Sequence, residues 1–419
     1  MKSFLGKPNT TRRPVYADRI VQRRHRPDYM LVVIVSTLLA IGLIVVYAIS
    51  PALRIQKNVG ENYFVLKQLS AIMLGIMAFG IVASIPFRVW QHSQKILIML
   101  ASLATIVALI LPISSEYPAH RWIRFGGLSL QSVELIKLAV LICLAAFLAQ
   151  RVKDGSVSDG KKSLRPILIF TGLISLVVGV AQKDLGSLGV LVAIIAFMSF
   201  VAGLSMKRVL IGAVLLIVVG FLLVVPFSYR RDRVLTFLHP EQDCQDIGYQ
   251  ACQALIAVGS GGLLGKGLSK GAQANGYLPE ASNDSIFAII GEKGGFLGAG
   301  VLVVLFGCLF GRIKNILERA PDDFSRLVVS GVLAWLSTQT IINIGAMIGL
   351  LPLKGITLPL ISYGGTSIIF VLAALGLVFQ VSRFTTFGIN TDIGGAGHES
   401  AIDWRRNRRS HYANPGRRA

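Results

Sequence analysis

The stretch Tyr29–Ser50 reads YMLVVIVSTLLAIGLIVVYAIS and holds no charged residue in 22 positions. A helix that spans a bilayer needs about 20 mostly apolar residues, so this stretch predicts a membrane-spanning helix. The chain contains ten such runs, at 29–50, 63–85, 95–113, 130–150, 166–181, 187–204, 207–228, 286–312, 327–351 and 367–384. They predict an all-α, polytopic membrane protein of ten transmembrane helices.

The composition of the chain supports a membrane protein and excludes a soluble one. Of the 419 residues, 53% are hydrophobic and 15% are charged, and the mean hydropathy is +0.65. A soluble chain of this length would form two or three domains of about 150 residues, with a more polar composition. The composition therefore agrees with the apolar runs.

The two ends of the chain carry almost half of its net positive charge. The net charge is +21, with eight Lys or Arg against two acidic residues in 1–28, and seven Arg against three acidic residues in 383–419. Basic segments beside apolar spans are typical of cytoplasmic tails. We therefore predict basic cytoplasmic tails at 1–28 and 385–419 around a membrane domain at 29–384. Ten spans place both tails on the same side of the membrane. Seven spans separate the cytoplasmic N-terminal tail from the loop between helices 7 and 8, residues 229–285, so this loop is extracytoplasmic.

Two cysteines, Cys244 and Cys252, lie in this long external loop. In an oxidising space they could form a small clamp around Gly248. If the segment is helical, however, the eight-residue separation puts them about 12 Å apart, which is too far for a disulfide. The sequence leaves both arrangements open.

Several polar residues fall at membrane depth, where a charge costs at least about 2.5–3.5 kcal/mol on insertion scales. Glu134 and Lys137 are three residues apart, so they share a helical face and can pair. They form either a structural salt bridge or part of a functional cavity, and desolvation of a buried pair favours the cavity. Gln339 and Asn343 also share a face, where interhelical hydrogen bonds explain them.

Asp284 ends the long loop, directly before the apolar run that begins at Ser285. It is a candidate first-turn carboxylate at the external boundary of the eighth span, and capping of the helix would also explain it. Cations gather in the same external segments. They snorkel towards lipid headgroups or together hold an anionic head group, and they are Arg121, Arg124, Lys266, Lys270 and Lys354.

Four blocks of sequence combine these residues with glycine-rich motifs. They are Arg121–Ile123 with Gln131–Lys137, Gln182–Gly186, Tyr249–Gln250 with Ala257–Leu263 and Tyr277–Ala288, and Leu351–Ser367. Together they resemble the motifs of the SEDS family (shape, elongation, division and sporulation), the polytopic peptidoglycan glycosyltransferases. Around Asp284 the sequence departs from the family pattern, with Ser282, Asn283 and Ser285 in place of His, Thr and Phe. The Lys354–Thr357 core resembles the FtsW-like division branch more than the RodA-like elongation branch.

This resemblance implies that the chain polymerises lipid II into glycan strands at the outer face of the cytoplasmic membrane during cell division. It implies that Asp284 is the general base and that Glu134 and Lys137 are catalytic residues lining the same cavity, with Lys137 facing the substrate or orienting Glu134. The implied substrate-binding residues are Arg121, Trp122, Lys266, Glu280, Lys354 and Ser362. The cations among them would hold the diphosphate, whereas Trp122 would stack on a sugar or merely anchor at the membrane interface. The alternatives are a lipid II transporter or flippase and a RodA-like elongation polymerase.

The resemblance also implies partners and a location. The partners are lipid II, a class B penicillin-binding transpeptidase, other division proteins and the lipid bilayer. The location is the bacterial cytoplasmic membrane, at the division septum. No metal-ligand cluster and no cofactor is evident in the sequence, although Mg²⁺ or Mn²⁺ on the diphosphate is chemically reasonable. No nucleic-acid partner is expected, because no aromatic or motif framework accompanies the terminal arginines.

Overall fold

The computed structural model describes residues 22–24, 26–60, 62–111, 121–125, 128–212, 214, 237, 244–246 and 248–386. Most of both predicted tails, 1–28 and 385–419, and most of the predicted span 207–228 lie outside these residues.

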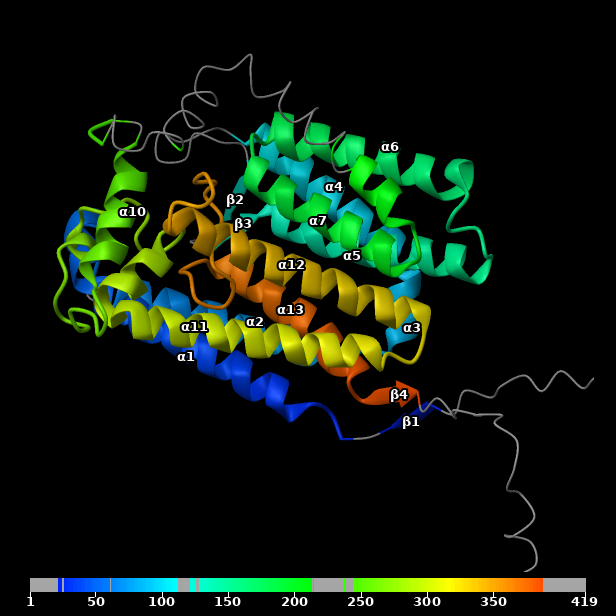
Figure 1. Cartoon of the computed structure of the whole chain (residues 1–419), viewed down its shortest axis with the longest axis horizontal. Helices are drawn as coiled ribbons and strands as arrows, with labels where there is room; N and C mark the ends of the chain where they lie inside the picture. The colour runs from blue at the N-terminus through cyan, green and yellow to red at the C-terminus, as the bar shows by residue number, and fades with distance from the viewer. Residues whose placement is uncertain are drawn as a thin grey trace, which may run out of the picture. The chain divides into compact units, whose positions relative to one another are not determined.

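Helices make up most of the described chain (Figure 1). Six segments are long and apolar enough to cross a membrane: α1 (Tyr29–Lys57), α2 (Tyr63–Ser84), α5 (Ser132–Lys153), the run η1–α6–η2 (Gly160–Leu164, Arg165–Ile174, Ser175–Ala181), α11 (Ile286–Glu318) and α12 (Asp323–Met347). Shorter apolar helices are α4 (Gln94–Ile110), α7 (Leu185–Val201) and α13 (Gly365–Val381). The remaining helices described are α3 (Phe87–His92), α10 (Tyr249–Ser260) and η4 (Gln273–Asn275).

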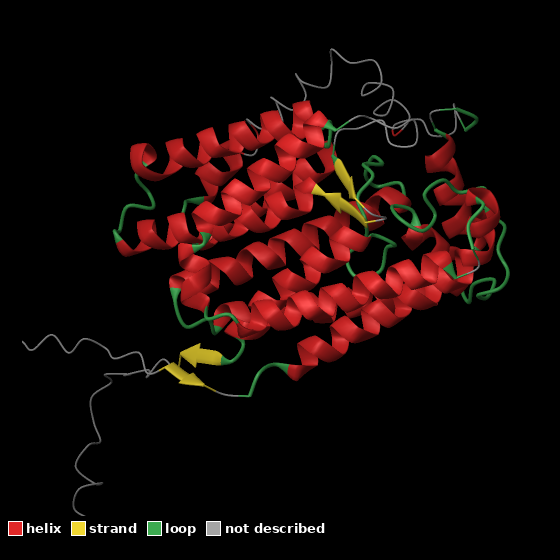
Figure 2. Cartoon of the chain, turned by 180° about the vertical axis from the view of Figure 1, so that it is seen from behind, coloured by secondary structure: helices red, strands yellow, loops and turns green. Residues whose placement is uncertain are grey.

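Two small antiparallel sheets interrupt the all-α architecture expected from the sequence (Figure 2). Strands β2 (Trp122–Phe125) and β3 (Leu128–Gln131) form a hairpin, with Trp122 opposite Gln131, that leads directly into α5. Strands β1 (Gln22–Arg24) and β4 (Phe384–Thr386) pair the segment before α1 with the segment after α13. Strands of three or four residues are too short to show a clear period of two, so they cannot be predicted from the pattern of apolar residues.

The helices divide into inner and outer ones by burial. The most apolar windows of α5 and α12 are 89% and 67% buried, whereas those of α2 and α11 are 28% and 22% buried. The outer helices expose many large apolar side chains, including Leu66 and Met73 of α2 and Val301 and Val304 of α11. Such an apolar surface is expected where helices face lipid.

Glycine permits close packing between α2 and α13. A Cβ added to Gly376 would lie 2.8 Å from the Phe79 carbonyl oxygen, and one added to Gly75 would lie 2.5 Å from Leu372 Cδ1. Small residues at helix contacts in membranes let backbones approach closely. The two helices therefore pack tightly at these positions.

The helix α11 is broken at Gly295. This residue has φ 65° and ψ −164°, which is not helical. The segment 261–267 lies against the break, where the Phe296 amide donates to the Gly262 carbonyl (2.8 Å) and the Leu297 amide to the Leu263 carbonyl (3.1 Å). The predicted span 286–312 is thus two helical pieces, because only glycine readily adopts the backbone conformation at position 295.

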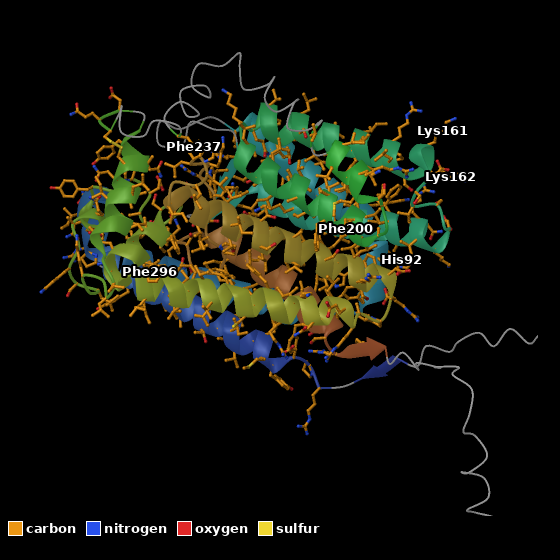
Figure 3. The ribbon with its side chains drawn as sticks, viewed as in Figure 1. His92, Lys161, Lys162, Phe200, Phe237 and Phe296 are labelled. Atoms are coloured by element: carbon orange, nitrogen blue, oxygen red, sulfur yellow. A yellow bond between two sulfur atoms is a disulfide. The ribbon has the colours of Figure 1, made fainter. Side chains whose placement is uncertain are left out.

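The two ends of the bundle differ in character. Lys161, Lys162 and His92 lie towards one end in Figure 3, and Phe296, directly after the break in α11, lies towards the other. In Figure 1, α10 lies at the same end as Phe296, and β1 and β4 lie towards the end that holds His92.

We predict that Gly376→Ala destabilises the bundle by about 1–3 kcal/mol, because its Cβ would overpack against the α2 backbone. The measurement is the thermal unfolding midpoint of the purified protein in detergent. Gly80→Ala on α2 is the control, since nothing lies within 4 Å of an added Cβ there. Equal shifts for the two variants would contradict the proposed contact.

Candidate functional site

Asp284 lies in a tight turn before α11. The N-cap of that helix is Ser285, so Asp284 precedes the helix and is neither a first-turn residue nor the cap. Its backbone carbonyl accepts a hydrogen bond from Asn343 Nδ2 (2.7 Å), and the side chain is half-buried. A Cβ added to Gly355, whose φ is +63°, would lie 3.2 Å from Asp284 Oδ2. The carboxylate therefore lies against the segment that contains Gly355.

This segment, the loop 352–364 between α12 and α13, is hydrogen-bonded to the Asp284 turn. Ser362 Oγ donates to the Asn283 carbonyl (2.6 Å) and accepts from the Leu358 amide (2.7 Å). The Tyr363 amide donates to the Ser282 carbonyl (2.8 Å). The hydroxyl of Ser362 is thus engaged by backbone groups, and its predicted contact with substrate stays a prediction.

Glu134 and Lys137 pair as their spacing predicts. Lys137 Nζ lies 2.8 Å from Glu134 Oε1, and both side chains are buried. Lys137 also donates to Gln339 Oε1 (3.0 Å). The indole of Trp335, whose Nε1 donates to the same Gln339 oxygen (2.8 Å), lies with its ring centroid 5.0 Å from Lys137 Nζ. A buried ammonium is therefore surrounded by a carboxylate, an amide oxygen and an aromatic face, each of which stabilises its charge.

The helix α12 connects this ion pair to the Asp284 turn. Gln339 Nε2 donates to the Thr357 carbonyl (2.9 Å), and one turn further Asn343 Nδ2 donates to the Ile356 carbonyl (2.7 Å) as well as to Asp284. The predicted shared face of Gln339 and Asn343 is confirmed. Trp335 was missed by the sequence analysis, although its position four residues before Gln339 places it on that face.

Two buried acceptors in this network have no hydrogen-bond partner among the described residues, Glu134 Oε2 and Asn343 Oδ1. Buried polar atoms without partners are few in native proteins, and each calls for an explanation such as bound water or a ligand. The network can therefore accept further hydrogen bonds from water or from a hydroxyl.

Arg121 forms an ion pair with Asp184 (3.3 Å). Asp184 is buried and caps α7, because its carboxylate accepts from the Ser187 amide (3.0 Å). Next to it, a Cβ added to Gly186 would lie 2.9 Å from the Lys354 carbonyl oxygen. The structure thus brings the Arg121 segment, Lys354 and Asp284 together around the loop 352–364.

Lys266 lies with a different carboxylate. Its Nζ is 3.6 Å from Glu292 Oε1, with 39% of the lysine side chain exposed and none of the glutamate. Glu292 also accepts from the backbone amides of Gln273 (3.1 Å) and Ala274 (3.2 Å). Glu292 therefore fixes the loop 265–274 onto α11, a long-range role for which the sequence offers no spacing signal.

The remaining predicted substrate contacts lie at two different places. Trp122 is half-buried at the start of β2. Glu280 is exposed in the turn before Asp284, with φ +51°, and its carboxylate accepts a hydrogen bond from Asn283. Among the described residues, no three His, Cys, Asp or Glu side chains form a group that could hold a metal ion.

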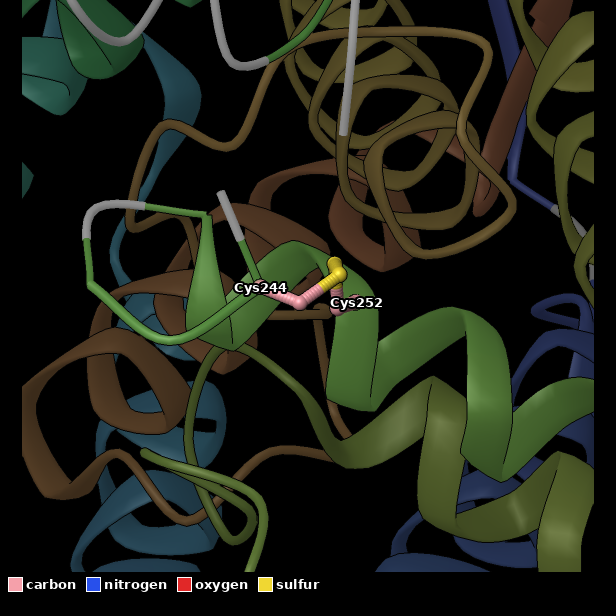
Figure 4. The surroundings of a disulfide bond; sticks show 2 residues. All are labelled: Cys244 and Cys252. Atoms are coloured by element: carbon pink, nitrogen blue, oxygen red, sulfur yellow. A yellow bond between two sulfur atoms is a disulfide. The ribbon is translucent and has the colours of Figure 1, made fainter. Parts of the chain in front are cut away.

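Cys244 and Cys252 form a disulfide bond, with 5.6 Å between their Cα atoms (Figure 4). The helix α10 begins at Tyr249, so the segment between the two cysteines is helical only in part. The helical arrangement that would separate them is therefore wrong, and the clamp around Gly248 is what forms.

A bundle of apolar helices with a carboxylate held at one end of a broken helix defines a polytopic membrane protein with a polar site. Residues 28–387 match the FtsW/RodA/SpoVE family model, described as cell cycle protein, and the chain belongs to this family. The predicted SEDS membership is therefore confirmed.

The relatives and solved structures agree with this membership. Stage V sporulation protein E of Bacillus subtilis is 35% identical, over 87% of this chain and 99% of that protein. The probable peptidoglycan glycosyltransferase FtsW of Nitrosomonas europaea is 38% identical, over 87% and 95%. A chain from a peptidoglycan synthase complex that coordinates polymerization and crosslinking has a TM-score of 0.71 at 26% identity, covering 85% of this chain and 98% of its own length. Thermus thermophilus RodA has a TM-score of 0.60 at 25% identity, covering 85% and 97%.

We predict that Lys137→Met lowers the free energy of unfolding by about 3–5 kcal/mol, because it leaves Glu134 buried without its counter-ion. The double variant Glu134→Leu/Lys137→Met should recover most of this loss, since neither charge then remains buried. Thermal unfolding in detergent measures both. Lys314→Met is the control, because the exposed Lys314–Glu318 pair (3.7 Å) contributes at most about 1 kcal/mol. A double variant as unstable as the single one would contradict this account.

Proposed function

We infer that the chain is a peptidoglycan glycosyltransferase, and we propose that its chemistry takes place at the Asp284 turn. Several relatives named FtsW peptidoglycan glycosyltransferase match it over most of its length, which agrees with the enzyme class predicted from the sequence. The observation that supports the site most directly is the position of Asp284. Its half-buried carboxylate lies against Gly355, the residue after Lys354. The same loop contacts Gly186, which is two residues from Asp184, the partner of Arg121.

The proposed reaction joins two lipid II molecules. The 4-hydroxyl oxygen of one sugar bonds to C1 of another, the bond from that C1 to the diphosphate oxygen breaks, and undecaprenyl diphosphate leaves. Asp284 would accept the hydroxyl proton as the new bond forms, since a sugar alcohol is a weak acid. Arg121 and Lys354 would stabilise the charge that develops on the diphosphate, because fixed cations at a developing charge lower the barrier.

Glu134 and Lys137 would act through α12. Lys137 donates a hydrogen bond to Gln339. Gln339 and Asn343 in turn donate hydrogen bonds to the loop 352–364, against which Asp284 lies. We propose that the pair fixes this loop and that Glu134 Oε2 accepts a hydrogen bond from substrate or water. Lys266 remains a predicted diphosphate contact, because it is 39% exposed even while it pairs with Glu292.

A divalent ion would enter with the substrate. The described donor set around Asp284 offers no group of three ligands, and Mg²⁺ is usually bound by one or two carboxylates together with substrate phosphates. We therefore propose that Mg²⁺ or Mn²⁺ would bind together with the diphosphate of the substrate.

We propose ten membrane spans with both termini in the cytoplasm. The three shorter apolar helices have 17 residues each, which is close to the lower limit of about 17 for a span. The run 207–228 would be the tenth. The Cys244–Cys252 disulfide supports an oxidising, extracytoplasmic location for its end of the bundle, whereas the lysines of η1 support a cytoplasmic location for the other.

The division branch, the septal location and a class B penicillin-binding transpeptidase partner are further proposals. The FtsW names of several relatives and the likeness to a peptidoglycan synthase complex support them. A flippase remains the alternative function. It would need charged groups along a continuous route across the bilayer, whereas Asp284, Lys354 and the Arg121–Asp184 pair lie around the loop 352–364.

We predict that purified protein converts lipid II into glycan polymer and that Asp284→Asn abolishes this activity, because the amide cannot accept the proton. Gel separation of labelled product measures it, and an unchanged melting temperature shows that the variant folds. Asp323→Asn, an exposed change in the first turn of α12, should keep full activity. Polymer from the Asp284 variant would refute the base, and lipid scrambling without polymer would favour the flippase.

We predict that a single cysteine at Lys270 reacts with a membrane-impermeant maleimide in intact cells. A cysteine at Lys153, at the far end of α5, should react only after permeabilisation. Both positions are exposed. The experiment uses a chain with Cys143 and Cys308 replaced by Ala, so that the bonded pair is the only other cysteine. The reverse labelling pattern would overturn the orientation and with it the proposed site.

A further inference from the structure

A polar cavity lies at the end of the bundle opposite Asp284. It measures about 360 Å³ and is formed by the segment before α1, the last turns of α11 and the end of α13. Its polar lining consists of Arg26, Asp28, Arg312, Asn315, Arg319 and Ser382. Asp284 precedes α11 and Arg319 follows it, so the helix separates the two sites. The 23 residues after the break at Gly295 alone span about 35 Å, which exceeds the hydrocarbon core of about 30 Å.

The charges around this cavity do not cancel. Arg312 is neutralised, because both its Nε (3.1 Å) and its Nη2 (2.7 Å) donate to Asp28 Oδ2. Asp28 is also held in place through its backbone amide, which donates to Ser382 Oγ (3.1 Å). Arg26 and Arg319 form no ion pair with any residue that the structure describes. The cavity therefore has a fixed ion pair in its wall and two arginines with no counter-ion among the described residues.

The same cavity has an apolar edge. Tyr29 and Met30, the first residues of α1, line it and are 61% and 56% exposed. Aromatic and apolar side chains at the first turn of a spanning helix lie where headgroups meet the hydrocarbon region. The lining therefore combines guanidinium groups with exposed aromatic and apolar side chains.

We propose that this cavity binds the phosphate of an anionic phospholipid headgroup from the cytoplasmic leaflet, with Arg26 and Arg319 as its ligands. Guanidinium groups bind phosphate oxygens in bidentate geometry. Basic pockets between helices on the cytoplasmic side of membrane proteins are typical sites for acidic lipids. A soluble phosphate has the same chemistry, but the exposed Tyr29 and Met30 favour a ligand with acyl chains. The proposal depends on the orientation of the chain and not on its enzymatic activity.

The test measures thermal unfolding of the purified full-length protein in a nonionic detergent. Short-chain phosphatidylglycerol, short-chain phosphatidylcholine and inorganic phosphate are titrated separately. We expect phosphatidylglycerol to raise the melting temperature and phosphatidylcholine, which has no net charge, to have little effect. In Arg26→Gln/Arg319→Gln the apparent affinity for phosphatidylglycerol should fall by about 30-fold, since each basic side chain near the surface contributes about one factor of five.

One control variant and one single cavity variant make the result specific. Lys314→Gln removes a positive charge from the same end of α11 but does not line the cavity, so it should bind the lipid normally. Arg319→Gln alone leaves the Asp28–Arg312 pair and Arg26 in place and gives the same comparison if the double variant does not fold.

Each outcome decides the proposal. Loss of lipid stabilisation in the cavity variants but not in Lys314→Gln supports the lipid site. Stabilisation by inorganic phosphate equal to that by phosphatidylglycerol, and lost in the same variants, supports a phosphate site filled from solution. If phosphatidylglycerol stabilises the cavity variants as much as the wild type, or does not stabilise the wild type at all, the proposed site is wrong. Because no lipid II is present, the result is independent of whether Asp284 is the base.

Discussion

One buried amide, the side chain of Asn343, joins three segments that are distant in sequence. Its Nδ2 donates to the carbonyls of Asp284 and Ile356, both at 2.7 Å, from near the C-terminal end of α12. A buried carbonyl without a hydrogen bond costs roughly 1–3 kcal/mol, so these two contacts are strongly favoured over alternatives. They fix the turn before α11 and the loop before α13 relative to one helix. The position of the Asp284 carboxylate depends on this arrangement.

The buried ion pair extends the same constraint along α12. Lys137 donates a hydrogen bond to Gln339, and Gln339 donates one to the carbonyl of Thr357. Thr357 directly follows Ile356, whose carbonyl accepts from Asn343. Two desolvated charges contribute little net stability, because their attraction barely offsets the loss of water. We infer that the pair contributes specificity, because a different packing of α5 against α12 would separate the buried Lys137 ammonium from its acceptor Gln339. Glu134 Oε2 and Asn343 Oδ1, which have no hydrogen-bond partner among the described residues, are the atoms at which this network can accept a further hydrogen bond.

The sequence predicts those features that depend on local spacing. The apolar runs predict the long helices. The separations of three and four residues predict the Glu134–Lys137 pair and the shared face of Gln339 and Asn343. Contacts between distant segments escape this reasoning. The Arg121–Asp184 and Lys266–Glu292 pairs each join residues from separate elements. No periodicity reports such pairs. The sequence marks Arg121 and Lys266 as cations of the external segments, but it does not identify Asp184 and Glu292 as their partners.

The break at Gly295 explains why α11 can serve both the site and the membrane. The piece 286–294 begins beside Asp284 and includes Glu292, which accepts two amides of the loop 265–274. The piece 296–318 exposes apolar side chains such as Val301 and Val304 and ends beside Arg319. A continuous helix would couple the direction of the first piece rigidly to that of the second. With the break, the loop contacts and Asn343 set the direction of the short piece, while lipid and neighbouring helices set that of the long one.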